Sequence, residues 1–195
     1  MDLSPRARER LERIGSLSDT EQQHLQREHE VEAVLSQFFT SNMTTDELWQ
    51  QLKSLSATYG AMIVKQTQER IAETIRLQMN DDDFETRKAA VMALETLKDS
   101  GSYTTIESLL GSIVSLRQRY NEVKQQALEQ VRAQMEGQVR AAAEQARRQG
   151  MLVDTASAIE ANIMNSQEWR EFISRHDAAA QNTLDDYLSR LKATF

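Results

Sequence analysis

Apolar residues recur at spacings of three and four along most of the chain, which is the period of one helix face. The clearest run falls within residues 103–149, where neither proline nor a turn-forming cluster interrupts the pattern. Its apolar positions are Ile106, Leu109, Ile113, Leu116, Tyr120, Val123 and Ala127. They alternate spacings of three and four, as the a and d positions of a coiled coil do. The pattern predicts one coiled-coil-like helix of about 45 residues, close to 70 Å long.

The stripe changes in the second half of this segment, where Val131, Met135 and Val139 are spaced by four. A run of fours resembles an inserted stutter, which locally unwinds a left-handed supercoil. The polar side carries two charge pairs at i,i+4 spacing, Glu136–Arg140 and Glu144–Arg148. Such pairs support an exposed helix.

Two helices are expected before residue 40. Ser4 and Pro5 form a typical helix start, and Gly15 ends a short helix that reaches about Ile14. Ser18 and Glu21 have capping-box spacing at the start of the second helix. Its apolar stripe consists of Val31, Val34, Leu35 and Phe38.

Thr44 and Glu47 form a second capping-box pattern, and apolar positions then continue straight through Gly60. We therefore expect one long helix over residues 45–79, bent near Gly60, with two helices that break there as the alternative. A fourth helix over residues 83–98 is expected to be capped by Asp82 with Glu85. The acidic cluster there lacks the glycine and the twelfth-position glutamate of a calcium loop.

After Gly150, Asp154 or Thr155 can cap a short helix, and Ser166 can cap a final one. The sequence therefore predicts an all-α fold, an elongated helical bundle that forms a single domain over residues 1–195. Its expected parts are N-terminal helices (1–40), a helical hairpin (45–99), the long helix (103–149) and C-terminal helices (154–195).

Composition narrows the function. One proline and six glycines in 195 residues suit a few long helices. A net charge of −7 disfavours nucleic acid as a partner, and the absence of cysteine excludes disulfides and thiolate sites. The longest apolar run, Ala89–Leu94, is far below the roughly 20 residues of a membrane span. The N-terminus lacks the apolar core of a signal peptide, so a cytoplasmic protein is expected.

Glu21 and His24 have the Glu-x-x-His spacing of carboxylate-bridged di-iron bundles, and Glu28 shares their helix face. A di-iron site needs two such pairs and two further glutamates. Because only one pair exists, we interpret this stretch as a solvated helix surface and predict no metal and no cofactor.

His176 lies on the apolar stripe of the final helix, between Phe172 and Ala180. We interpret it as a core or interface histidine that is hydrogen-bonded to a neighbour. A catalytic base is the alternative, but the sequence shows no nucleophile or phosphate-loop motif to go with it. Trp49 and Trp169 also lie on apolar faces and are expected to belong to the core.

Four arginines, Arg6, Arg8, Arg10 and Arg13, make the first helix basic. It could lie on an anionic membrane surface, but it is short, carries two glutamates and lacks an aromatic anchor. We expect it to fold back on the domain instead.

The preferred hypothesis is a non-enzymatic helical interaction or scaffold protein that forms a homodimer through its long helix, or binds a partner helix there. The residues expected to mediate self-association are Leu116, Tyr120, Val123, Val131, Met135 and Val139. The alternative is a small-molecule-binding bundle, or an unfamiliar enzyme, with a polar pocket near His176.

Overall fold

The computed structural model describes residues 19–40, 43–99, 101–149 and 154–195. Within these ranges the chain forms seven α-helices and no strand, which confirms the all-α prediction. Residues group into two compact units, each described here by itself. Unit 1 comprises the described residues within 1–74 and 82–103 together with Phe195, and unit 2 comprises the described residues within 75–81 and 104–194. The single-domain prediction stays a prediction.

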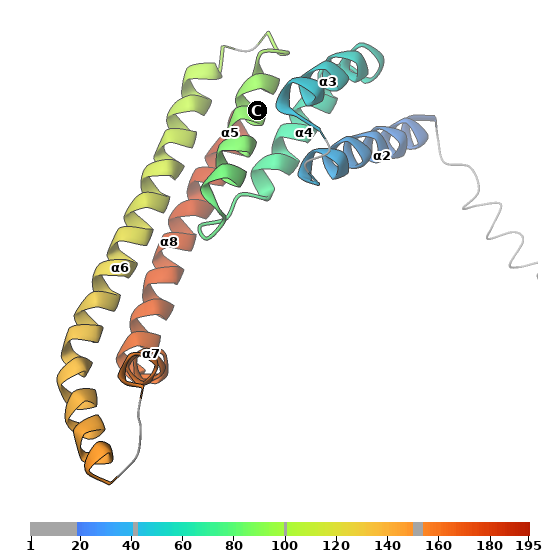
Figure 1. The fold of residues 1–195 in the computed structure, drawn as a ribbon. Coiled ribbons are helices and arrows are strands. Elements are labelled where there is room, and N and C mark those ends of the chain that lie inside the picture. The colour runs from blue at the N-terminus through green and yellow to red at the C-terminus, as the bar shows by residue number, and fades with distance from the viewer. Residues whose placement is uncertain (1–18, 41–42, 100, 150–153) are drawn as a thin grey trace, which may run out of the picture. The chain divides into compact units, whose positions relative to one another are not determined.

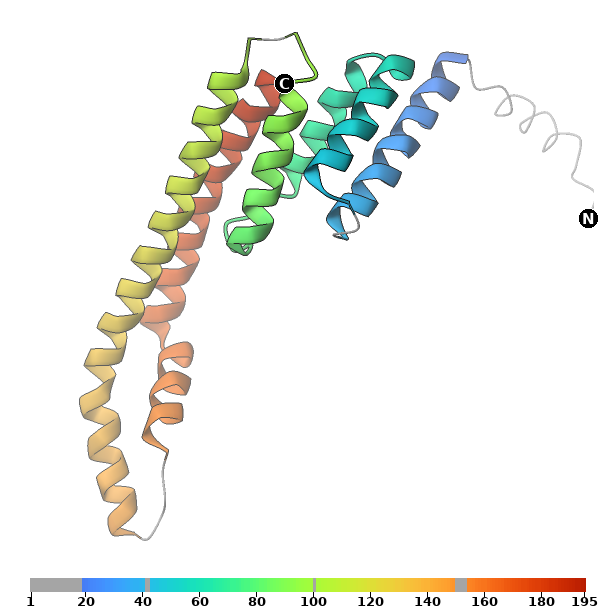
Figure 2. The same ribbon diagram turned by 45° about the horizontal axis from the view of Figure 1, so that its top comes forward.

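Unit 1 contains helices α2 (Asp19–Phe39), α3 (Thr45–Tyr59) and α4 (Met62–Glu73), and α5 (Asp81–Glu95) except for its first residue. Helices α2, α3 and α4 contact one another in pairs (Figures 1 and 2). The predicted capping box is confirmed, since Thr44 and Glu47 each bond the other's backbone N–H at the start of α3. The fully or nearly buried apolar side chains of this unit include Val31, Phe38, Leu48, Leu52, Ile63, Ile71, Phe84, Val91 and Leu94.

The prediction of one helix over residues 45–79 was wrong, and the alternative of two helices is correct. Helix α3 ends at Tyr59, and Gly60 adopts φ 78° and ψ 176°. This region of backbone space is essentially restricted to glycine, so the chain leaves α3 there and starts α4 at Met62. Helix α4 then ends at Glu73, and residues 74–80 form turns rather than a helical continuation.

The start of α5 also differs from the prediction. Helix α5 begins at Asp81, so Asp82 lies inside its first turn and is not the N-cap. Asp81, Asp82 and Asp83 still place carboxylates at the positive end of the helix dipole. The predicted helix over residues 4–14 and the Ser18 cap lie outside the described residues.

Three polar groups are buried together in unit 1. The Gln68 amide donates to the Val91 carbonyl at 3.0 Å and to the Glu95 carboxylate at 3.1 Å. Lys98 lies 2.7 Å from the same carboxylate, and the side chains of Glu95 and Lys98 are only 1% and 8% exposed. Lys98 also donates to the Phe195 carbonyl at 3.3 Å. Gln68, in the middle of α4, is thereby hydrogen-bonded to a buried ion pair at the end of α5.

Unit 2 contains most of α6 (Tyr103–Arg148) together with α7 (Thr155–Asn165) and α8 (Gln167–Thr194). The 46-residue α6 confirms the predicted long helix, and α8 runs beside it (Figures 1 and 2). Asp154 caps α7 through the Ala156 N–H, and the Ser166 hydroxyl accepts from the Trp169 N–H, as predicted. No described helix is long and apolar enough to cross a membrane.

Candidate functional site

A row of stacked rings links α8 to α6. Trp169 stacks on Phe172, Phe172 on His176, and His176 on Tyr120, with ring centroids 5.7, 5.3 and 4.9 Å apart. The Nε2 atom of His176 lies 3.1 Å from the Tyr120 carbonyl oxygen. Trp169 is buried and His176 half-buried. The prediction of a packed, hydrogen-bonded His176 is confirmed.

The Tyr120 hydroxyl is the centre of a polar network within unit 2. It donates to the Asp177 carboxylate at 2.9 Å and accepts from the Gln78 amide at 2.6 Å. Lys124 Nζ lies 3.5 Å from the same hydroxyl. Because every group has a defined partner, the network fixes Tyr120 and the segment around Gln78 rather than leaving a reactive group exposed to a substrate.

Arg117 attaches the same segment to α6. Its guanidinium donates to the carbonyls of Leu77 and Met79 and pairs with the Asp81 carboxylate at 2.9 Å. The Arg117 side chain is only 6% exposed, although Arg117 lies outside the apolar stripe predicted for this helix. Periodicity did not indicate this burial, because the predicted stripe passed through Leu116 instead.

A shallow depression of about 420 Å³ lies beside this network. Its lining residues are Arg76, Leu77, Gln78, Asp177, Ala178 and Gln181. His176 is not among them, so the depression does not place an imidazole in position to act on a bound molecule.

The Glu-x-x-His stretch on α2 is exposed. His24 lies 3.7 Å from Glu28, and both side chains are about half exposed, at 51% and 46%. Among the described residues, no three His, Asp or Glu side chains are grouped so that they could hold a metal ion.

The residues expected to mediate self-association differ in their exposure to solvent. Tyr120 is buried within unit 2, and Val139 is 9% exposed. The other four, Leu116, Val123, Val131 and Met135, are half-buried. The end of α6 has a neighbour in its own chain, because α7 lies against it: Arg132 of α6 is 3.5 Å from Glu160 of α7.

Helix α7 nevertheless leaves a groove beside α6. The groove has a volume of about 460 Å³. Met135, Val139 and Ala142 line it from α6, and Asn162, Asn165 and Ser166 line it from the α7 side. Two of the predicted self-association residues therefore lie together at an open surface.

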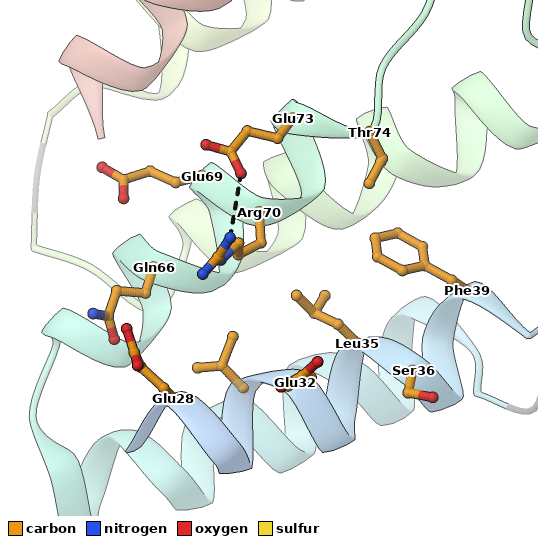
Figure 3. Close-up of a pocket in the computed structure, with 11 residues that line it drawn as sticks. Glu28, Glu32, Leu35, Ser36, Phe39, Gln66, Glu69, Arg70, Glu73 and Thr74 are labelled. Carbon is orange, nitrogen blue, oxygen red and sulfur yellow. Dashed lines mark ion pairs between the residues drawn. The ribbon is translucent and has the colours of Figure 1, made fainter. Parts of the chain in front are cut away.

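A second groove, of about 760 Å³, lies between α2 and α4 in unit 1 (Figure 3). Its apolar lining comes from Val31, Leu35 and Phe39. Four glutamates and one arginine line it as well, namely Glu28, Glu32, Glu69, Glu73 and Arg70. Arg70 is paired with Glu73 at 3.7 Å, so the groove is strongly acidic.

The profile of a family of unknown function (DUF6657) matches residues 49–195, which is most of the chain. The chain belongs to this family. The matched part contains the Tyr120 network and the α6–α7 groove, whereas α2 precedes it. Neither a curated protein nor a solved structure matches the chain.

Proposed function

We propose that the protein is a non-enzymatic helical scaffold that self-associates through the end of its long helix. The observation that carries this proposal is the α6–α7 groove, where Met135 and Ala142 remain accessible beside Val139. A second α6 that entered this groove would cover all three side chains. The occupant is thus a second copy of the chain.

The accessible side chains of the groove favour an antiparallel pair of α6 helices. A two-fold axis midway between Met135 and Ala142 places Met135 opposite Ala142 of the second copy, a large side chain opposite a small one. A parallel pair in register would instead place Met135 against Met135 and Ala142 against Ala142.

The low charge of α7, the helix on the other side of the groove, also supports an interface there. Glu160 is the one charged residue in its 11 positions, whereas 27% of the whole chain is charged. A short helix that faced only water would be expected to carry more charge.

The surroundings of His176 and His24 support the non-enzymatic part of the proposal. His176 packs between two rings, and His24 is exposed beside a carboxylate. A small-molecule-binding bundle with a pocket near His176 stays the alternative, since a depression lined by Asp177 and Gln181 lies on the same helix. A cytoplasmic location belongs to the same proposal and is tested by cell fractionation.

Sedimentation velocity over a range of protein concentrations tests the proposal. We expect the wild-type chain to form a dimer, and Met135→Glu/Ala142→Glu to be monomeric because carboxylates would face each other across the axis. Ala141→Glu, on the opposite side of α6, is the matched control and should leave the dimer intact. Circular dichroism should show equal helicity for all three proteins. A wild-type chain that is monomeric throughout, or a double variant that stays dimeric, refutes the proposal.

A further inference from the structure

The α2–α4 groove in unit 1 carries two carboxylates on each of its helices. Glu28 and Glu32 lie one turn apart on α2, and Glu69 and Glu73 lie one turn apart on α4 (Figure 3). Like charges at this spacing repel each other within a helix. Arg70 is the one basic residue among the described residues that line the groove. The groove therefore favours a positively charged occupant.

Ion pairs within each helix do not neutralise these carboxylates. The pairs are His24 with Glu28 at 3.7 Å, Lys65 with Glu69 at 3.8 Å, and Arg70 with Glu73 at 3.7 Å. All of these distances are longer than a hydrogen bond, and the side chains are partly exposed. Exposed pairs of this kind contribute little, so an incoming cation still gains from the acidic field of the groove.

A buried acceptor lies at one end of the groove. Gln66 of α4 lies next to Glu28 of α2 there, as Figure 3 shows. The Gln66 Oε1 atom is buried and has no hydrogen-bond partner among the described residues. A buried acceptor without a donor is destabilising, so an incoming N–H donor is favoured at this point. A lysine or arginine side chain can donate to both groups at once.

The rest of the groove is apolar, which favours an occupant with apolar side chains as well as charge. Val31, Leu35 and Phe39 line it from α2. Phe39 is 36% exposed, and Leu25, three residues before Glu28 on the same helix face, is 51% exposed. Leu25 and Phe39 are four helical turns apart, about 21 Å. This length matches an occupant helix of about 15 residues.

We infer that the α2–α4 groove binds an amphipathic helix of another protein, whose apolar face is bordered by lysine or arginine on both sides. Its apolar side chains would cover Leu25 and Phe39, and its cations would meet the carboxylates of α2 and α4. Apolar anchors at spacings of three and four are the usual basis of such helix-in-groove binding. Nucleic acid and anionic lipid would be repelled by the same carboxylates. This inference is independent of self-association through α6, which concerns unit 2.

A synthetic peptide tests the proposal on the full chain. The probe is a fluorescein-labelled peptide of about 15 residues, with leucines spaced by three and four and arginines on both sides of them. A peptide of the same composition in scrambled order controls for charge alone. We expect the patterned peptide to gain helicity on binding, measured by circular dichroism. By fluorescence anisotropy it should bind at least about tenfold more tightly than the scrambled peptide, because only the patterned one buries its leucines.

Charge reversal locates the binding. Glu32→Lys/Glu69→Lys should weaken it about tenfold, because two cations lose their partners and gain repulsion. Glu107→Lys/Glu122→Lys makes the same change of net charge at exposed positions of α6 and is the matched control. It should leave the affinity within about twofold, since distant exposed charges are screened.

A second pair of variants tests the apolar contact without changing charge. Leu25→Ser should weaken binding about fivefold, because the peptide then loses an apolar contact. Met62→Ser is the control, since Met62 is 53% exposed but does not line the groove. Circular dichroism of each variant checks that its fold is retained, and Leu25→Ser decides the matter if Glu32→Lys/Glu69→Lys is unfolded.

Four results would overturn the proposal. The first is no binding to the parent protein, because the groove would then be empty or covered by the chain itself. The second is equal binding of the scrambled peptide, and the third is equal weakening by a groove variant and its control. The fourth is loss of a dimer in Glu32→Lys/Glu69→Lys by sedimentation velocity, which would assign the groove to a second copy of the chain.

Discussion

Replacing Lys98 by methionine tests the buried ion pair at the end of α5. The substitution keeps much of the side-chain volume and leaves the Glu95 carboxylate, which is 1% exposed, without its cation. Breaking a buried ion pair by removing one partner typically costs about 3–5 kcal/mol. Gln68 still donates to Glu95 at 3.1 Å, so we expect a loss of about 3 kcal/mol, at the low end of this range.

The assay is urea denaturation followed by tryptophan fluorescence. Trp49 lies in unit 1, where its indole N–H donates to Thr96 at 3.0 Å, and Trp169 lies in unit 2. A Trp169→Phe background therefore makes the fluorescence report on the unit that contains Glu95. Circular dichroism of the same samples shows whether the two units unfold together.

The double variant Glu95→Leu/Lys98→Met is the control, because it removes both charges. Replacing a buried ion pair by apolar residues of similar size is often neutral or stabilising, so most of the lost free energy of unfolding should return. If Lys98→Met alone lies within about 1 kcal/mol of the parent, the carboxylate is hydrated and our reasoning about its burial is wrong.

The remaining predictions concern single positions. Gly60→Ala should cost about 1–3 kcal/mol of unfolding free energy in thermal or urea denaturation, because alanine is strained at φ 78° although no atom lies within 4 Å of the added Cβ. Gly111→Ala, at an open site within α6, should instead stabilise by about 1 kcal/mol, and equal effects at the two sites would contradict the assigned backbone geometry. His24→Ala should change stability by no more than about 0.5 kcal/mol, with or without stoichiometric Zn²⁺ or Fe²⁺; a metal-induced stabilisation that the variant abolishes would contradict this prediction. The backbone N–H and hydroxyl of Thr44 hold the pKa of Glu47 below its usual value, so Glu47 stabilises the fold above the glutamate range and loses this effect as the pH falls through its folded pKa. Glu47→Gln should therefore be less stable than the parent at pH 7 and converge with it in acid, and a difference that persists at pH 2 would show that the charge is not responsible.

The helices themselves could be predicted where local chemistry marks their ends. The Thr44–Glu47 capping box, the Asp154 cap and the uninterrupted α6 are all local features, and the structure confirms each. The sequence could not decide between one helix and two at Gly60, because the spacing of apolar residues continues through it. Periodicity shows which face of a segment is apolar but not whether the chain reverses direction there.

The environments of the candidate sites could not be predicted in the same way. Arg117 is buried because it meets the carbonyls of Leu77 and Met79, which lie 40 and 38 residues earlier in the chain. The Tyr120 hydroxyl likewise joins Gln78 to Asp177. These contacts depend on which segments pack together, and no single segment contains that information. His176 was predictable, since its position on an apolar stripe is a local property.

Disulfide trapping tests self-association through α6 most directly. In the proposed antiparallel pair, Met135 faces Ala142 of the second copy, so the variant Met135→Cys/Ala142→Cys should form a covalent dimer under mild oxidation. The two positions lie seven residues apart on one helix, about 10.5 Å, which is too far for a disulfide within a chain. Met135→Cys and Ala142→Cys alone should stay largely uncrosslinked. A covalent dimer from the double variant only is the predicted result. Efficient crosslinking of Met135→Cys alone would indicate a parallel pair, and no crosslinking of any variant at concentrations where sedimentation is measured would contradict the account.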